Sequence, residues 1–192
     1  RGTRARRRSV GRPAPGRAQG AAIGPRPRGG LGTDSMFADT LLAAERGHLL
    51  RLALWGAMSV VAGSAILALL SARRVRSPLL QHFAIQTAAW GAVDLAICAA
   101  AWRGLTLRDL TGAVALDRFL WFNIGLDVGY VAVGVTLAVV GWRLTRSLAL
   151  IGAGIGVIVQ GIALALLDLV LASLIPRLAF RPPLHASPVD PA

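Results

Sequence analysis

Residues Leu148–Leu174 read LALIGAGIGVIVQGIALALLDLVLASL, and Asp168 is the one charged side chain in this stretch. An apolar run of about 20 residues is long enough for an α-helix to cross the hydrocarbon core of a bilayer. The stretch therefore predicts a membrane-spanning helix, which we expect to stop at Pro176.

Three more apolar runs of similar length precede this one. They are Leu49–Ala72, Leu79–Trp102 and Phe119–Trp142. The connections at 73–78 and 143–147 are short enough to force antiparallel hairpins. The longer connection at 103–118 mixes apolar with charged residues, which is compatible with a short interfacial helix. We predict an all-α fold, an integral membrane four-helix antiparallel bundle with a disordered basic N-terminal arm.

The composition excludes most soluble classes. Of the 192 residues 55% are hydrophobic and only 16% charged, whereas a soluble domain carries about a quarter charged residues. The single cysteine, Cys98, rules out a disulfide framework. The sequence has no nucleotide-binding motif after a strand, no Cys/His cluster for zinc and no Ser/His/Asp set at one depth. We therefore expect no catalytic residues and no cofactor, and we lean against an enzyme.

The net charge of +12 is concentrated near the start of the chain. Nine of the 21 basic residues, all of them Arg, lie in residues 1–35, which are otherwise rich in Gly, Pro and Ala. Such a segment has little to bury, so we expect it to be disordered. Three origins compete: a basic arm for anionic lipid or nucleic acid, a targeting segment, or GC-rich DNA translated upstream of a start at Met36. We favour the last, and we do not expect nucleic acid as a partner.

These features divide the chain into a leader at 1–35, a four-span membrane domain at 36–176 and a Pro-rich tail at 177–192. From Met36 onward, the side of the bundle that holds both termini carries seven Arg, and the opposite side carries five. Positive charge favours the cytoplasmic side. We expect a multi-pass protein of the bacterial inner membrane, with both termini in the cytoplasm.

Three of the four predicted spans each contain one acid: Asp94, Asp127 and Asp168. At about 1.5 Å per residue, all three lie roughly 9–12 Å below the side of the termini. An acid inside a membrane is costly, and it is by default a candidate for a functional site.

Other polar residues lie at helical spacing from the acids. Gln86 shares a face with the acid of the second span, Asn123 and Tyr130 with that of the third, and Gln160 with that of the fourth. Lipid cannot satisfy buried polar groups, so we expect these faces to turn toward one another. Together with the three acids, these residues form our candidate polar or ion site.

The predicted layer of carboxylates has three interpretations. Protonated Asp, Asn and Gln can hold helices together through hydrogen bonds, the interpretation that we favour. Paired carboxylates can also carry protons or ions, and several oxygens can bind a divalent cation or a small polar ligand. Which metal, if any, the layer would bind stays open. A cavity that reaches the acids would favour transport or ligand binding, and a dry, fully paired cluster would favour structure.

Small residues predict close helix packing at two places. Gly125 and Gly129 flank the acid of the third span, and Gly152 and Gly156 lie in the fourth. Glycines at this spacing allow two helix backbones to approach each other.

Three strings carry a resemblance to a known family. They are QTAAWGAVD at 86–94, NIGLDVGY at 123–130, and a set in the fourth span that begins with GIG at 154–156 and continues through Gln160, Gly161 and Asp168. Over about residues 48–176 the chain resembles a family of small, uncharacterised bacterial four-helix membrane proteins, a domain of unknown function. The resemblance supports the four-span core and the polar positions, and it implies no activity.

The leading hypothesis is therefore a non-enzymatic accessory protein that binds partner helices. Its expected partners are the lipid bilayer and either a second copy or another membrane subunit. The first alternative is a small ion- or proton-coupled transporter that works as an oligomer. The second is a membrane protein that binds a metal or a polar ligand at the acids.

Overall fold

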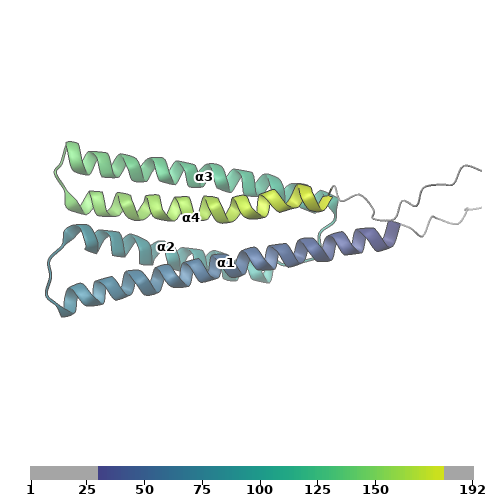
Figure 1. Cartoon of the computed structure of the whole chain (residues 1–192), viewed down its shortest axis with the longest axis horizontal. Helices are drawn as coiled ribbons and strands as arrows, with labels where there is room; N and C mark the ends of the chain where they lie inside the picture. Colours follow the sequence, from purple (N-terminus) through teal and green to yellow (C-terminus); the bar gives the residue numbers. More distant parts are fainter. Residues whose placement is uncertain (1–29, 180–192) are drawn as a thin grey trace, which may run out of the picture.

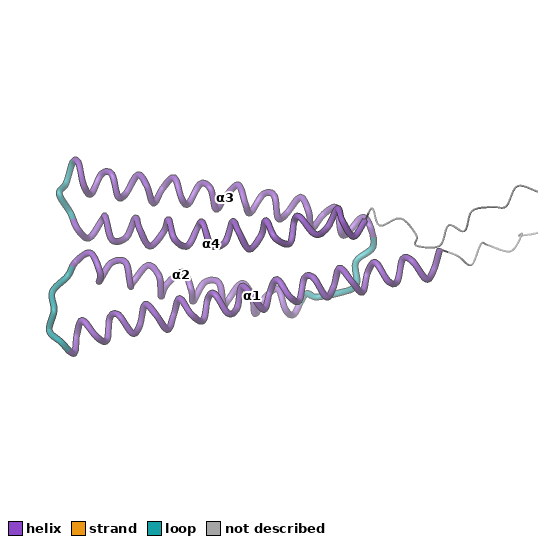
Figure 2. Tube along the Cα trace, in the orientation of Figure 1, coloured by secondary structure: helices purple, strands orange, loops and turns teal. Residues whose placement is uncertain are grey.

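A computed structural model describes residues 30–179, which form four helices and no strand (Figures 1 and 2). The helices are α1 (Gly30–Ala72), α2 (Pro78–Arg103), α3 (Leu110–Arg143) and α4 (Leu148–Ala179). The predicted all-α architecture is confirmed for this part of the chain. Residues 1–29 of the predicted leader and 180–192 of the predicted tail lie outside the described residues.

Local sequence signals set where two of the helices begin. Ser77 is the N-cap of α2 and its hydroxyl accepts a hydrogen bond from the Leu80 N–H at 3.4 Å, while Pro78 occupies the first turn. Proline is tolerated there because the first N–H groups of a helix have no partner within the helix. The carboxylate of Asp109 caps α3 by accepting from the Gly112 N–H at 2.8 Å.

The helices form two antiparallel hairpins, α1–α2 and α3–α4, that pack against each other. Helix α4 lies between α3 and the first hairpin, and it contacts α2 and, to a smaller extent, α1 (Figure 1). Helices α2 and α3 do not pack side by side, although they follow each other in the chain. The α2–α3 connection, the N-terminal end of α1 and the C-terminal end of α4 lie at one end of the bundle, called here the terminal end. The two hairpin turns lie at the other end.

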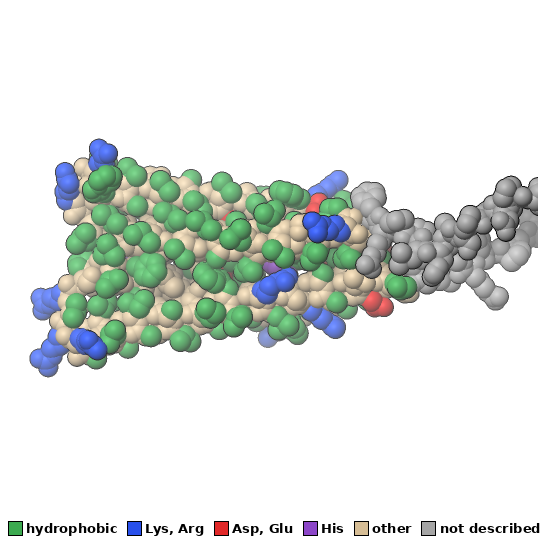
Figure 3. Space-filling view, viewed as in Figure 1, with side chains coloured by type: hydrophobic (Ala, Val, Ile, Leu, Met, Phe, Trp, Pro, Cys, Tyr) green, Lys and Arg blue, Asp and Glu red, His purple; other side chains and the backbone are tan. Residues whose placement is uncertain are grey.

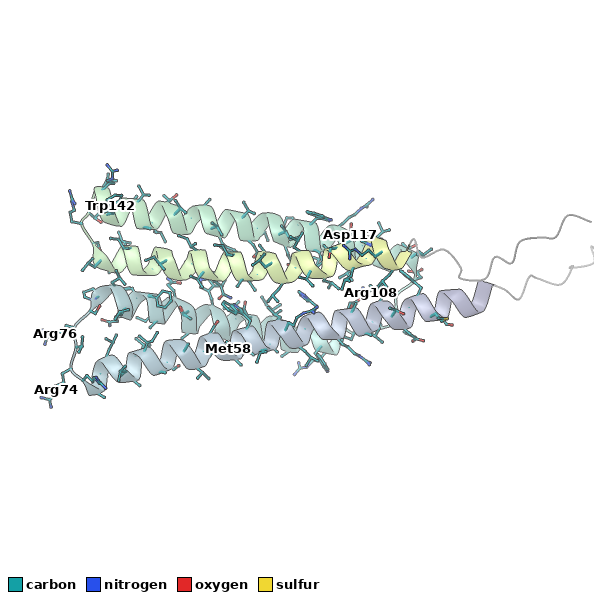
Figure 4. All side chains as sticks on the ribbon, in the orientation of Figure 1. Met58, Arg74, Arg76, Arg108, Asp117 and Trp142 are labelled. Carbon is teal, nitrogen blue, oxygen red and sulfur yellow. The ribbon has the colours of Figure 1, made fainter. Side chains whose placement is uncertain are left out.

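Each of the four helices is long and apolar enough to cross a membrane. Within the most apolar window of each helix only 17–39% of the residues are buried, so most of these side chains face outward. Soluble monomers rarely expose contiguous apolar surface on this scale. Figure 3 shows apolar side chains along one whole face, with basic ones near its two ends. In Figure 4, Arg74, Arg76 and Trp142 mark the end formed by the turns, and Arg108 and Asp117 lie toward the terminal end.

Three helices extend beyond the apolar runs that predicted them. Helix α1 begins at Gly30 rather than at Leu49, so residues 30–35 of the predicted disordered arm are helical. Helix α3 begins at Leu110, and no separate interfacial helix forms in the 103–118 connection. The predicted stop at Pro176 is wrong, because this proline lies inside α4.

Packing among the extensions explains these differences. The buried side chains of one apolar cluster come from the early part of α1, the early part of α3 and the late part of α4: Leu41, Ala113, Leu120, Leu171, Ala172 and Ile175. A proline inside a helix removes one backbone hydrogen bond. The neighbouring Ile175 is only 5% exposed in this cluster, and its burial offsets that loss.

Glycines hold the helices of each hairpin close together. A Cβ atom on Gly91 would lie 2.6 Å from the Gly56 carbonyl oxygen of α1, and one on Gly134 would lie 2.7 Å from the Gly154 carbonyl oxygen of α4. The backbones therefore approach more closely than any side chain would permit.

The four glycines that the sequence singled out divide into two pairs. Gly152 and Gly156 lie at the contact between α4 and α2. Gly125 and Gly129 are exposed, and a Cβ atom on either would meet nothing within 4 Å, so they hold no two helices of the described chain together. A helix turns about 100° per residue, so positions two residues away from the inward-facing Asp127 point away from the bundle.

Candidate functional site

A cavity of about 490 Å³ lies between α2 and α3 in the half of the bundle nearer the terminal end. Asp94, Asp127 and Asp168 all line this α2–α3 cavity, so the three acids predicted at one depth share one site. Asn123 and Tyr130 of α3 also line it. Its remaining walls come from α1, α4 and the α2–α3 connection.

The two predicted glutamines have different positions. Gln160 is 4% exposed and its Nε2 donates a hydrogen bond to Oδ2 of Asp94. Its Oε1 accepts from the indole N–H of Trp55 at 3.1 Å, so this chain of bonds joins α1, α4 and α2. Gln86 does not line the cavity; it packs where α2 crosses Gly156.

Two contacts between a basic and an acidic side chain tie α1 to the rest of the site. Nε2 of His48 lies 3.3 Å from Oδ1 of Asp168 on α4. Nε of Arg108, in the α2–α3 connection, donates to Oε1 of Glu45 at 2.7 Å. All four side chains line the cavity, so the basic groups of its wall are already paired with acids.

Asp127 differs from the other acids of the cavity. Asp127 is only 5% exposed, and its Oδ2 is buried without a hydrogen-bond partner in the described structure. An unsatisfied buried polar atom costs about 1–3 kcal/mol, and native structures contain few of them. Two residues that line the cavity therefore each have one buried polar atom without a partner, Asp127 at Oδ2 and His48 at Nδ1. Oδ1 of Asp117, which lies outside the cavity, is a third such atom among the described residues.

Aromatic and aliphatic side chains form the rest of the wall. The rings of Trp90 on α2 and Tyr130 on α3 meet edge to face, with centroids 5.0 Å apart and an interplanar angle of 62°. Val93, Ile97 and Leu126 add apolar surface beside them. The site is thus an apolar chamber with a few carboxylates, which is the general composition of small-molecule sites.

Sequence reasoning missed the contribution of α1 and of the α2–α3 connection. Leu41, Glu45, His48, Leu49 and Leu52 recur at helical spacing and are all buried, so this pattern would have extended the first helix upstream into the site. No local signal announces the pairing of Arg108 with Glu45, because it depends on how the connection folds back over α1.

The geometry does not assemble a metal centre within residues 30–179, where no three His, Cys, Asp or Glu side chains come together as ligands. The interpretation of the acids as a metal site therefore gains no support from their positions.

These features define a class of protein: a bundle of four helices, each able to cross a membrane by length and composition, around a carboxylate-lined cavity. The chain belongs to a family of unknown function, DUF6992, whose match covers residues 51–169 and includes all three acids of the layer. This confirms the resemblance to an uncharacterised family. No curated protein and no solved structure matches the chain.

Proposed function

We propose that this chain is a membrane protein that binds a small molecule in the α2–α3 cavity. The observation that carries the proposal is the free, buried Oδ2 of Asp127 at a cavity of about 490 Å³. Small-molecule sites commonly enclose about 300–1,000 Å³. A purely structural layer would be dry and fully paired; all three acids line the cavity, and whereas Asp94 and Asp168 each have a partner, Oδ2 of Asp127 has none.

A thiol introduced at Asp127 tests this function without assuming a ligand. We suggest Asp127→Cys in a Cys98→Ser background, treated in lipid vesicles with methyl methanethiosulfonate, which is neutral and membrane-permeant. The matched control is Ala172→Cys, because Ala172 is 2% exposed in the apolar cluster of the helix ends and does not line the cavity. We expect fast modification of the first variant and slow modification of the second. Equal, slow rates would mean that the cavity admits no small molecule.

Transport of the bound molecule would be a further activity of the same cavity. The cavity lies in one half of the bundle, so ion- or proton-coupled transport would need a second state that opens it toward the hairpin turns. We place the terminal end on the cytoplasmic side of a bacterial inner membrane, following the larger number of Arg near that end.

The exposed glycines of α3 favour a second candidate function, an accessory role that binds a partner helix. Gly125 and Gly129 lie beside exposed Phe122 and Val133, a surface where another helix can approach closely. Oxidative crosslinking of Gly129→Cys in membranes tests a pairing between two copies, with Leu54→Cys on the exposed side of α1 as the control. Crosslinking no faster for Gly129→Cys than for the control would exclude pairing through this surface.

A further inference from the structure

We propose that the α2–α3 cavity binds an organic cation with an apolar body, which reaches Asp127 through the open flank between α2 and α3. This inference rests on the proposed binding function and names the chemical class of the ligand.

The charges of the cavity wall select for a cation. Four acids line it, Glu45, Asp94, Asp127 and Asp168, against two basic groups, Arg108 and His48. Arg108 pairs with Glu45 and His48 pairs with Asp168 through Nε2, which leaves His48 Nδ1 without a partner. The acids of the wall still outnumber its basic groups, and neither basic group is paired with Asp127. A buried, unpaired carboxylate is costly, and a positive group beside it removes much of that cost. An anion would instead place a second uncompensated charge beside Asp127.

The remainder of the wall selects for an apolar body. Trp90 lies one helical turn before Asp94, and Tyr130 lies three residues after Asp127, so both rings share a helix face with an acid. Aromatic faces attract cations within about 6 Å of the ring centroid. A bare metal ion prefers several oxygen ligands, and no three His, Cys, Asp or Glu side chains of residues 30–179 come together to hold one.

The open side of the cavity is apolar as well. Val93 and Ile97 on α2, and Phe119 and Leu126 on α3, line it and are 43–58% exposed. Helices α2 and α3 do not pack side by side along this flank, and the contact between the Trp90 and Tyr130 rings joins them at one level. Toward the terminal end, the Glu45–Arg108 pair ties α1 to the connection. The least polar route into the cavity therefore runs from the flank that would face lipid.

Four probes separate charge from apolar contact in the full chain, held in phosphatidylcholine nanodiscs. Benzyltrimethylammonium carries both features. Neopentylbenzene has the same shape without the charge, tetramethylammonium has the charge without the ring, and benzenesulfonate has a ring with the opposite charge. Titration of the tryptophan fluorescence, corrected with empty nanodiscs, measures binding. We expect benzyltrimethylammonium to bind about tenfold or more tightly than each of the other three.

Two variants assign the charge effect to one residue. Asp127→Asn should weaken benzyltrimethylammonium binding about tenfold or more, because the compensating carboxylate is lost. Asp117→Asn is the control, since Asp117 lies on the same helix and does not line the cavity. Unchanged binding in Asp127→Asn, or equal binding of the neutral and cationic probes, would overturn the proposed ligand class.

The outcome is distinguishable from that of the broader proposal. If the Asp127→Cys thiol reacts quickly but no cationic probe binds, the cavity takes a small molecule of another class. If the thiol stays unreactive, the binding function itself is wrong.

Nitroxide labels test the route of entry. Attached to Ile97→Cys and to Phe119→Cys in the Cys98→Ser background, they should be more accessible to oxygen, which dissolves in lipid, than to a water-soluble nickel chelate. The reverse order would place the opening in water and overturn the lateral route.

Discussion

Adding a single methyl group at Gly134 should destabilise the protein, whereas adding one at Gly129 on the same helix should not. A Cβ atom on Gly134 would lie 2.7 Å from the Gly154 carbonyl oxygen and 2.9 Å from the Ile158 nitrogen. Both neighbours are backbone atoms of α4, so no side-chain rotation relieves the contact. At Gly129 the same atom would meet nothing within 4 Å.

The expected size of the effect follows from two opposing contributions. Overpacking a close contact costs about 1–3 kcal/mol, and the backbone atoms at Gly134 place this site in the upper part of that range. Replacing glycine by alanine inside a helix returns up to about 1 kcal/mol. We therefore expect Gly134→Ala to lower the free energy of unfolding by about 1–2 kcal/mol. Gly129→Ala should leave it unchanged or raise it by up to about 1 kcal/mol.

Reversible unfolding in mixed micelles of a mild detergent and dodecyl sulfate measures both variants under identical conditions. The sign of the difference between them is the decisive quantity, because detergent effects common to both cancel. If Gly134→Ala were as stable as Gly129→Ala, then α3 would not face α4 through Gly134, and the inward orientation of Asp127 would be wrong as well.

Three further predictions concern the polar site and the topology. Gln160→Leu leaves a buried carboxylate of α2 without its amide donor, so it should lower the free energy of unfolding by about 1–3 kcal/mol. Gln86→Leu, compared in the same micelle titration, should change that free energy by less than about 0.5 kcal/mol. Arg108→Gln should cost more stability than Glu45→Gln in that titration, because it leaves a carboxylate with 7% side-chain exposure unpaired, whereas the Arg side chain is 33% exposed; an equal cost would contradict this asymmetry. A fluorescent or enzymatic reporter fused after Ala179 should be active on the cytoplasmic side, and activity on the opposite side would reverse the proposed orientation.

The sequence was sufficient to predict the four helices and the common depth of three acids. Long apolar runs select helices almost without competition in a bilayer, and depth follows from the rise per residue. The extensions of α1 and α3 were not predictable in this way, because hydropathy ends where their charged residues begin. Their helical structure is stabilised by contacts between distant segments, such as Leu41 with Leu171 and Ile175.

The α1 contribution to the site shows a second limit. His48 and Glu45 stand just outside the first apolar run, where charged groups at a membrane boundary are ordinary. Only the three-dimensional arrangement places them against Asp168 and Arg108. The glycines show the same limit: the spacing of Gly125 and Gly129 predicts close packing but does not say whether a helix of the same chain is there to pack against.

The packing order of the helices explains why one acid of the cavity has no partner. Asp94 on α2 is next to α4 and accepts a hydrogen bond from Gln160. Asp168 on α4 is next to α1 and pairs with His48. Helix α3 packs along its length against α4, meets α1 in the apolar cluster near the terminal end, and on its other inward side borders the cavity. On that side, no donor of the described residues reaches Oδ2 of Asp127. The free oxygen of Asp127 is therefore a consequence of leaving α2 and α3 apart, and a ligand between them would supply the missing partner.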